Sequence, residues 1–137
     1  MTNNPWIPLF ITTENFIPVE ALAEYDAVLF LQKAAKAIDS AKNEIIYGET
    51  ISELLSANEN GLKECHRSLA TIGLWHFECG VELFNKAIRN FERAEKRGLS
   101  KAKQKEVEVQ INECRKQLVT VTKQKDSAVD LLNSIGS

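Results

Sequence analysis

Two neighbouring pairs of cysteine and histidine are the side chains best suited to chemistry in this 137-residue chain. They are Cys65 with His66, and His76 with Cys79. On one helix the eleven positions between Cys65 and His76 correspond to about 16 Å along the axis, which is too far for a shared metal ion. His76 and Cys79 lie three positions apart on one helical face, so they are weak candidates for a metal site that a partner helix would complete.

A structural role accounts for His76 more simply than a ligand role. A histidine within an apolar helical seam typically forms a hydrogen bond across the helix interface and thereby fixes the register of the two helices. Cys79 lacks a third group that would orient His76 as a base, and a buried seam cysteine is normally unreactive. Neither histidine follows a glutamate by three positions, as a di-iron bundle requires, and the sequence has no phosphate loop, nucleophile elbow or zinc-protease motif. We therefore predict a protein that is not an enzyme and carries no cofactor.

The composition indicates that long helices carry these side chains. Apolar residues make up 44% of the chain and charged residues 26%, which is typical of one ordinary globular domain. All three prolines lie at or before Pro18 and there are only six glycines, so turns are few and helix is permitted almost everywhere after the last proline. We predict an all-α protein: a single domain over residues 19–137, built as a bundle of long antiparallel helices.

Three helices follow from the stop and start signals. The first is expected over residues 19–47 with Gly48 as its stop, and the second over residues 51–97, where Thr50 and Glu53 form a capping box. Ser100 caps the third helix, which pairs with the second around a turn at Gly98 and Leu99. A break at the Asn and Gly of residues 56–61 would give four helices, but we favour a continuous or merely kinked helix because its apolar seam stays in phase.

Heptad seams of apolar residues run along each expected helix and indicate coiled-coil packing. The first helix contributes Ala27, Leu31, Ala34, Ile38, Ala41 and Ile45. The second contributes Ile51, Leu55, Asn58, Leu62, Cys65, Leu69, Ile72, His76, Cys79 and Leu83, and the seam then moves by one position to Phe84, Ala87, Phe91 and Ala94. The third contributes Val107, Ile111, Cys114, Leu118, Val121, Lys125, Ala128, Leu132 and Ile135.

Residues 1–18 are expected to form an extended apolar arm. They contain three prolines and no helical period, yet they are too apolar for a disordered tail. The arm must therefore dock, either on its own bundle, which we favour, or across a partner subunit. Trp6 and Phe10 are its expected contact residues, with Trp6 as the anchor because it offers the largest apolar surface there.

Unequal helix lengths predict an interface. A first helix that ends at residue 47 covers the second only as far as about residue 77, at ~1.5 Å per residue. Phe84, Ile88 and Phe91 would then remain uncovered, and exposed apolar surface of this kind usually marks an interaction site. We therefore expect a homo-oligomer or a complex with another helical protein.

Positive charge is concentrated late in the chain. Residues 1–85 hold five Lys and Arg against twelve Asp and Glu, whereas residues 86–125 hold twelve against five. Seven of these cations gather at the expected turn between the second and third helices and form what we call the basic tip: Arg89, Arg93, Lys96, Arg97, Lys101, Lys103 and Lys105. A solvated helix face explains such a cluster, and non-specific contact with nucleic-acid phosphates is the alternative.

The three cysteines are odd in number and fall within expected helices, which favours a reducing compartment, and we predict a cytoplasmic protein. No apolar run approaches the roughly 18 residues of a membrane span, so no membrane partner is expected. The preferred function is a non-catalytic, self-associating interaction or assembly module. A nucleic-acid-associated accessory protein that uses the basic tip is the second hypothesis, and a metal- or haem-binding bundle is the third.

Overall fold

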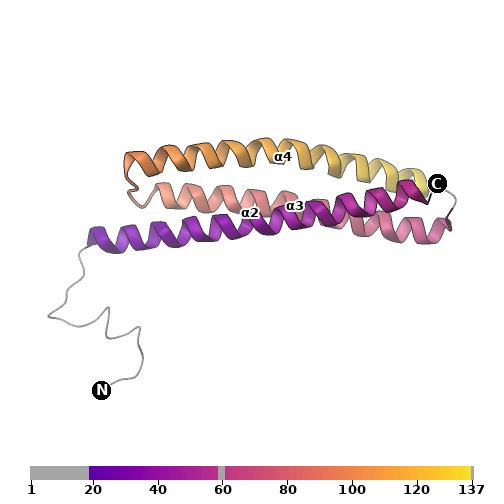
Figure 1. Ribbon diagram of the computed structural model, residues 1–137, viewed down its shortest axis with the longest axis horizontal. Coiled ribbons are helices and arrows are strands. Elements are labelled where there is room, and N and C mark those ends of the chain that lie inside the picture. The colour runs from indigo at the N-terminus through magenta and orange to yellow at the C-terminus, as the bar shows by residue number, and fades with distance from the viewer. Residues whose placement is uncertain (1–18, 59–60, 137) are drawn as a thin grey trace, which may run out of the picture.

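The computed structural model describes residues 19–58 and 61–136, which form three long helices that lie side by side (Figure 1). These are α2 (Val19–Ala57), α3 (Lys63–Glu95) and α4 (Lys101–Gly136), of 39, 33 and 36 residues. Within the described residues the fold is thus an all-α three-helix bundle, as predicted. α3 packs on both α2 and α4 and is the central helix. The predicted arm, with Trp6 and Phe10, lies outside the described residues.

The predicted stop at Gly48 is wrong, because α2 continues through this residue to Ala57. Gly48 is buried, and a Cβ atom there would lie 2.7 Å from the ring of Phe77. The predicted capping box does not form either: the Thr50 hydroxyl donates to the Ile46 carbonyl oxygen at 2.8 Å, which is a bond within a continuing helix. Gly48 therefore serves close helix packing and does not end the helix.

The predicted continuous helix across residues 56–61 is also wrong. α2 ends at Ala57 and α3 begins at Lys63. The Asn58 side chain donates to the Leu54 carbonyl oxygen at 3.1 Å, and the Gly61 amide donates to the Asn58 carbonyl oxygen at 3.0 Å. Because these bonds satisfy carbonyl groups that a helix end would leave free, the Asn- and Gly-containing stretch terminates α2. The bundle accordingly has three helices within the described part of the chain. α2 ends within residues 56–61, where the alternative prediction placed a break.

The buried face of α3 differs by one position from the predicted seam as far as Leu83 and then coincides with the predicted Phe84, Ala87, Phe91 and Ala94. It consists of Ala70, Gly73, Phe77, Gly80, Phe84, Ala87, Asn90, Phe91 and Ala94. Leu62 and Ile72 of the predicted seam are 76% and 46% exposed. The buried face carries a phenylalanine every seven residues, with mostly Gly or Ala between them. Because two of its positions are glycines, which have no apolar side chain, the heptad pattern of apolar residues does not reveal this face. Phe84 and Phe91 thus continue a single seam that begins at Ala70.

α2 and α4 bury the faces that the sequence predicts. The core takes Ala27, Ala34, Ala37, Ala41 and Leu55 from α2, and Val107, Ile111, Cys114 and Val121 from α4. Gly80 of α3 is where the three helices meet, since a Cβ there would lie 3.2 Å from Ile45 and 3.5 Å from Val121. Small residues on α2 and α3 therefore allow the phenylalanine rings to fill the space between the helices.

α2 covers α3 along almost all of its length. Gly48 faces Phe77 and Ile51 faces Gly73, so residues later in α2 meet residues earlier in α3. The other end of α2 reaches the turn after α3, where Phe30 lies beneath Arg97. The predicted uncovered surface is therefore wrong: Phe84 and Phe91 are only 1% and 5% exposed.

Ile88, the third residue of that surface, is partly buried against the same core. The physical reason is the position of the first turn. A turn after Ala57, some ten residues later than predicted, makes α2 long enough to reach the far end of α3 at ~1.5 Å per residue.

The turn between α3 and α4 agrees with the sequence. Gly98 has a φ of +80°, a conformation that glycine adopts without strain, and Lys96 is the C-cap of α3. The Ser100 hydroxyl accepts a hydrogen bond from the Lys103 amide at 3.2 Å, which confirms the predicted cap of the last helix.

Candidate functional site

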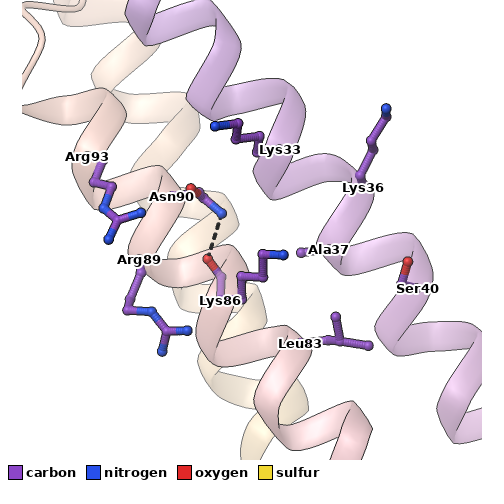
Figure 2. Close-up of a pocket in the computed structure, with 9 residues that line it drawn as sticks. All are labelled: Lys33, Lys36, Ala37, Ser40, Leu83, Lys86, Arg89, Asn90 and Arg93. Carbon is purple, nitrogen blue, oxygen red and sulfur yellow. Dashed lines mark hydrogen bonds between the residues drawn. The ribbon is translucent and has the colours of Figure 1, made fainter.

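An open groove of about 450 Å³ lies between α2 and α3, and we call it the basic groove (Figure 2). Its lining comes from these two helices only: Lys33, Lys36, Ala37 and Ser40 of α2, and Leu83, Lys86, Arg89, Asn90 and Arg93 of α3. Buried Ala37 and partly buried Leu83 belong to the packed seam between the helices. The groove is thus the outer edge of the α2–α3 interface.

Positive side chains dominate both walls of the basic groove. Five of its lining residues are Lys or Arg and none is acidic. Within the described part of the chain none of these five forms a salt bridge, since the ion pairs found there are His76 with Glu44 and Lys103 with Glu106. Lys33 and Lys86 extend into the space between the helices, whereas Lys36 points away from it (Figure 2). The groove therefore presents positive charge that no salt bridge among the described residues neutralises.

Two of these cations also contact an aromatic ring. The Lys33 ammonium lies 5.3 Å and the Arg93 guanidinium 6.0 Å from the centre of the Phe30 ring. Arg97 approaches the same ring at 5.1 Å. Cation–π contacts of this kind hold the cations near one end of the groove and occupy the ring that could otherwise stack on a ligand.

Asn90 supplies a polar group at the base of the groove. Its side chain is buried and donates to the Lys86 carbonyl oxygen at 3.1 Å. This bond joins positions four apart on α3 and holds the amide between the two helices (Figure 2). A buried polar residue in the phenylalanine seam thus lies directly beside the unpaired cations.

Along the α2–α3 edge, from Arg89 toward Cys79, the lining changes from basic residues alone to a mixture of acidic and basic residues. A second hollow there is lined by Glu44, Cys79, Glu82, Leu83, Asn85, Lys86 and Arg89. His76 donates through Nδ1 to the Glu44 carboxylate, with 2.5 Å between the heavy atoms, and this is the cross-helix hydrogen bond predicted for it. Acidic groups therefore border the basic groove on this side.

An apolar patch surrounds His76. The ring centres of Tyr47 and Trp75 lie 5.3 and 5.0 Å from that of His76, and Ile72 precedes His76 by one turn of α3. Tyr47 and Trp75 are 53% and 57% exposed. We call Tyr47, Ile72 and Trp75 the apolar patch; the hydrogen bond from His76 to Glu44 ties the two helices together beneath it.

Cys79 and Cys114 are poor nucleophiles in this fold. Burial raises the pKa of the Cys79 thiol, and the carboxylates of Glu44, Glu82 and Glu78 raise it further. Burial also raises the pKa of the Cys114 thiol, with a smaller rise from its neighbour Glu113 and an opposing effect from Lys42. A thiol with a raised pKa carries little thiolate at neutral pH, so Cys79 lacks the activation that covalent catalysis needs.

The predicted metal candidates His76 and Cys79 lie on the same side of α3, as expected. Among residues 19–58 and 61–136, however, no three or more His, Cys, Asp and Glu side chains are arranged to hold a metal ion. The Nδ1 atom of His76 is engaged by Glu44. No ligand set for a metal therefore emerges from the described residues.

The seven residues of the predicted basic tip do not form one site in the structure. All seven side chains are exposed, but only Arg89 and Arg93 line the basic groove. Arg97 lies over Phe30, and Lys103 pairs with Glu106 at 3.3 Å. Lys96, Lys101 and Lys105 lie in or after the turn and line no part of the groove.

Sequence reasoning missed the other three cations of the groove, Lys33, Lys36 and Lys86. The available signal was their spacing, since Lys33 and Lys36 share one face of α2, and Lys86, Arg89 and Arg93 share one face of α3. The two faces could be matched only with the correct position of the turn between the helices. A turn at Gly48 would have placed Lys33 near Cys65 instead.

No helix in the described part of the chain is both long and apolar enough to cross a membrane. No protein-family model, curated protein or solved structure matches this chain. Function must therefore be argued from the geometry of its own surfaces.

Proposed function

We propose that the protein is a non-catalytic interaction module, an antiparallel three-helix bundle that pairs with a second copy of itself through the apolar patch. The observation that carries this proposal is the exposure of Trp75 and Tyr47, each of which contacts the ring of His76. Aromatic residues that are half exposed and adjacent on rigid helices are typical of the centre of protein interfaces.

A second copy is the favoured partner on two grounds. Most oligomers of soluble proteins are symmetric dimers in which the same surface of each subunit meets its copy. The net charge of the chain is only −2, so two copies repel one another weakly. The three cysteines, all free, support a reducing compartment such as the cytoplasm for this assembly.

Mass measurement in solution tests this proposal. Light scattering over a range of protein concentrations should show a dimer whose dissociation follows mass action. Trp75→Glu should give a monomer with an unchanged melting temperature at low concentration, because it places a charge in the interface and not in the core. Val109→Glu is the matched control, since Val109 is an exposed apolar residue of α4 away from the patch. A wild-type monomer at every concentration, or equal effects of both variants, would contradict the proposal.

Nucleic-acid binding through the basic tip is the second candidate function. Its support is the exposure of all seven cations and the extension of Arg89 and Arg93 into a larger positive surface. Phosphate contacts of this kind weaken steeply with salt. A gel-retardation assay with wild type and an Arg97→Glu, Lys101→Glu variant tests it: loss of retardation in the variant supports the tip, and no retardation of the wild type at low salt removes this candidate.

A further inference from the structure

We propose that the basic groove between α2 and α3 binds a short, multiply charged phosphate chain of the linear polyphosphate class. The ligand would be held by its phosphate groups alone. This inference does not rest on self-association, because the groove and the apolar patch are lined by different residues.

Charge is the first support. Five cations from two helices line one groove, and among the described residues none of them has a carboxylate partner. Like charges held close together destabilise a folded chain, so an arrangement of this kind is expected where an anion offsets the repulsion. Lys supplies point charges to phosphate oxygens, and Arg supplies paired N–H donors in a planar fork.

Shape is the second support. A volume of about 450 Å³ lies within the range of small-ligand sites. Lys86 and Arg93 are seven residues apart, which is about 10 Å along α3. Lys33 on the facing helix reaches into the same space (Figure 2). Lys33, Lys86, Arg89 and Arg93 thus border a stretch of the groove about 10 Å long, which suits a chain of a few phosphates better than a single one.

The surroundings limit the ligand further. No aromatic residue lines the groove, and Lys33, Arg93 and Arg97 already lie over the nearby Phe30 ring. Single-stranded nucleic acids rely on aromatic rings for base stacking, and the groove offers no such platform. Glu44 and Glu82 line the neighbouring hollow and would repel a polyanion that continued past Lys86. The groove therefore favours a short phosphate chain without a base over a long nucleic acid.

Calorimetric titration of the full chain with sodium tripolyphosphate is the test. We expect binding at low salt that weakens as salt rises, because each phosphate contact releases bound ions. Lys86→Gln with Arg89→Gln should weaken binding about 100-fold, since removing one charge-assisted hydrogen bond weakens it about tenfold. Lys101→Gln with Lys105→Gln removes the same charge outside the groove and should change the affinity less than about threefold.

A second variant guards against misfolding of the first. Lys33→Gln changes only α2 and should weaken binding about tenfold, and thermal unfolding of every variant verifies the fold. A single-stranded oligothymidylate, with tripolyphosphate as competitor, separates the two sources of phosphate. Oligonucleotide binding that tripolyphosphate does not displace would overturn the proposal in favour of nucleic acid. Equal weakening by both double variants, or no binding of tripolyphosphate at low salt, would also overturn it.

Discussion

Gly48 sets how closely α2 approaches α3. It lies inside a 39-residue helix, nine residues before the helix ends at Ala57, and the ring of Phe77 occupies the space where a side chain would begin. Glycine usually weakens a helix interior relative to alanine, by about 1 kcal/mol. Here its missing side chain admits an aromatic ring to the core, which outweighs that cost.

Gly48→Ala should therefore destabilise the protein in spite of the better helix propensity of alanine. The new Cβ would lie 2.7 Å from Cε1 and 2.8 Å from Cζ of Phe77, and overpacking of this kind costs about 1–3 kcal/mol. Urea unfolding measures the change. Gly73→Ala meets only Ile51 Cγ2 at 3.1 Å and should cost less, while Phe77→Leu added to Gly48→Ala should recover part of the stability. A more stable Gly48→Ala protein would contradict the packing described here.

The three thiols should react in an order set by exposure and pKa. Cys65 is exposed, whereas the pKa values of Cys79 and Cys114 are raised above the ordinary thiol value of 9.0. Alkylation by iodoacetamide, followed by mass spectrometry at pH 7 to 10, should modify Cys65 first and the other two only at higher pH. Because the folded state holds these two as neutral thiols, their contribution to stability is present below the pKa of the unfolded thiol. It is lost as the pH rises through the raised values. Early modification of Cys79 at pH 7 would be inconsistent with this environment.

At the scale of the element, the alternation of large and small residues defines the buried face of α3. Phe77, Phe84 and Phe91 are seven positions apart and all buried. Gly73, one turn before Phe77, lies against Ile51, and Gly80, between Phe77 and Phe84, lies against Ile45 and Val121. The ring of Phe77 in turn fills the space that Gly48 of α2 leaves open, so large residues of one helix lie against small residues of the next.

Alanine substitutions should separate the true face of α3 from the predicted one. Phe84→Ala removes a fully buried ring and should cost about 3–5 kcal/mol. Ile72→Ala truncates a half-exposed residue of the predicted seam and should cost less than about 1 kcal/mol. Chemical denaturation of both variants checks the register. Similar losses of stability for the two would show that α3 is rotated from the position described.

At the scale of the whole molecule, the outer edge of the α2–α3 pair carries two unlike surfaces. One end has the basic groove, and further along lie the acidic groups and the apolar patch around His76. Glu44 joins the two regions, since it lines the hollow next to the groove and accepts the hydrogen bond from His76. Two kinds of partner can therefore be tested on one face by separate variants.

Charge reversal in the groove should stabilise the ligand-free protein. Lys86→Glu places a carboxylate among four remaining cations but also near Glu82 and Glu44 of the neighbouring hollow, so it should raise stability by no more than about 0.5 kcal/mol at low salt. Thermal unfolding should show the gain fading near 1 M salt, where charges are screened over about 3 Å. Lys105→Glu, beside Glu106 and outside the groove, should give no gain. A Lys86→Glu protein that is less stable at low salt would indicate that Lys86 has a structural role.

Much of the architecture could be predicted from local signals. The absence of proline after Pro18 and the heptad seams of α2 and α4 indicated an all-α bundle, and Ser100 was found as a cap because N-capping depends only on neighbouring residues. That His76 forms a hydrogen bond across a helix interface was predicted from the sequence. Its partner, Glu44, was not, because it lies 32 positions away.

The sequence by itself determined which faces of α2 and α4 are apolar, that the described part of the chain is helical, where α4 begins and which residues of α3 are buried from Phe84 onward. Tertiary structure alone decided the first turn, the first half of the buried face of α3 and the basic groove. The physical reason is that glycine has two uses: it can end a helix through its backbone freedom or let another side chain approach closely. Gly48 and Gly61 both resemble helix ends in local sequence. A ring lies against each of them, but Phe77 reaches Gly48 from a different helix, whereas His66 near Gly61 is only five residues away in the chain. Since the contact of Phe77 with Gly48 sets the pairing of α2 with α3, it also brings Lys33 beside Lys86 and Arg93.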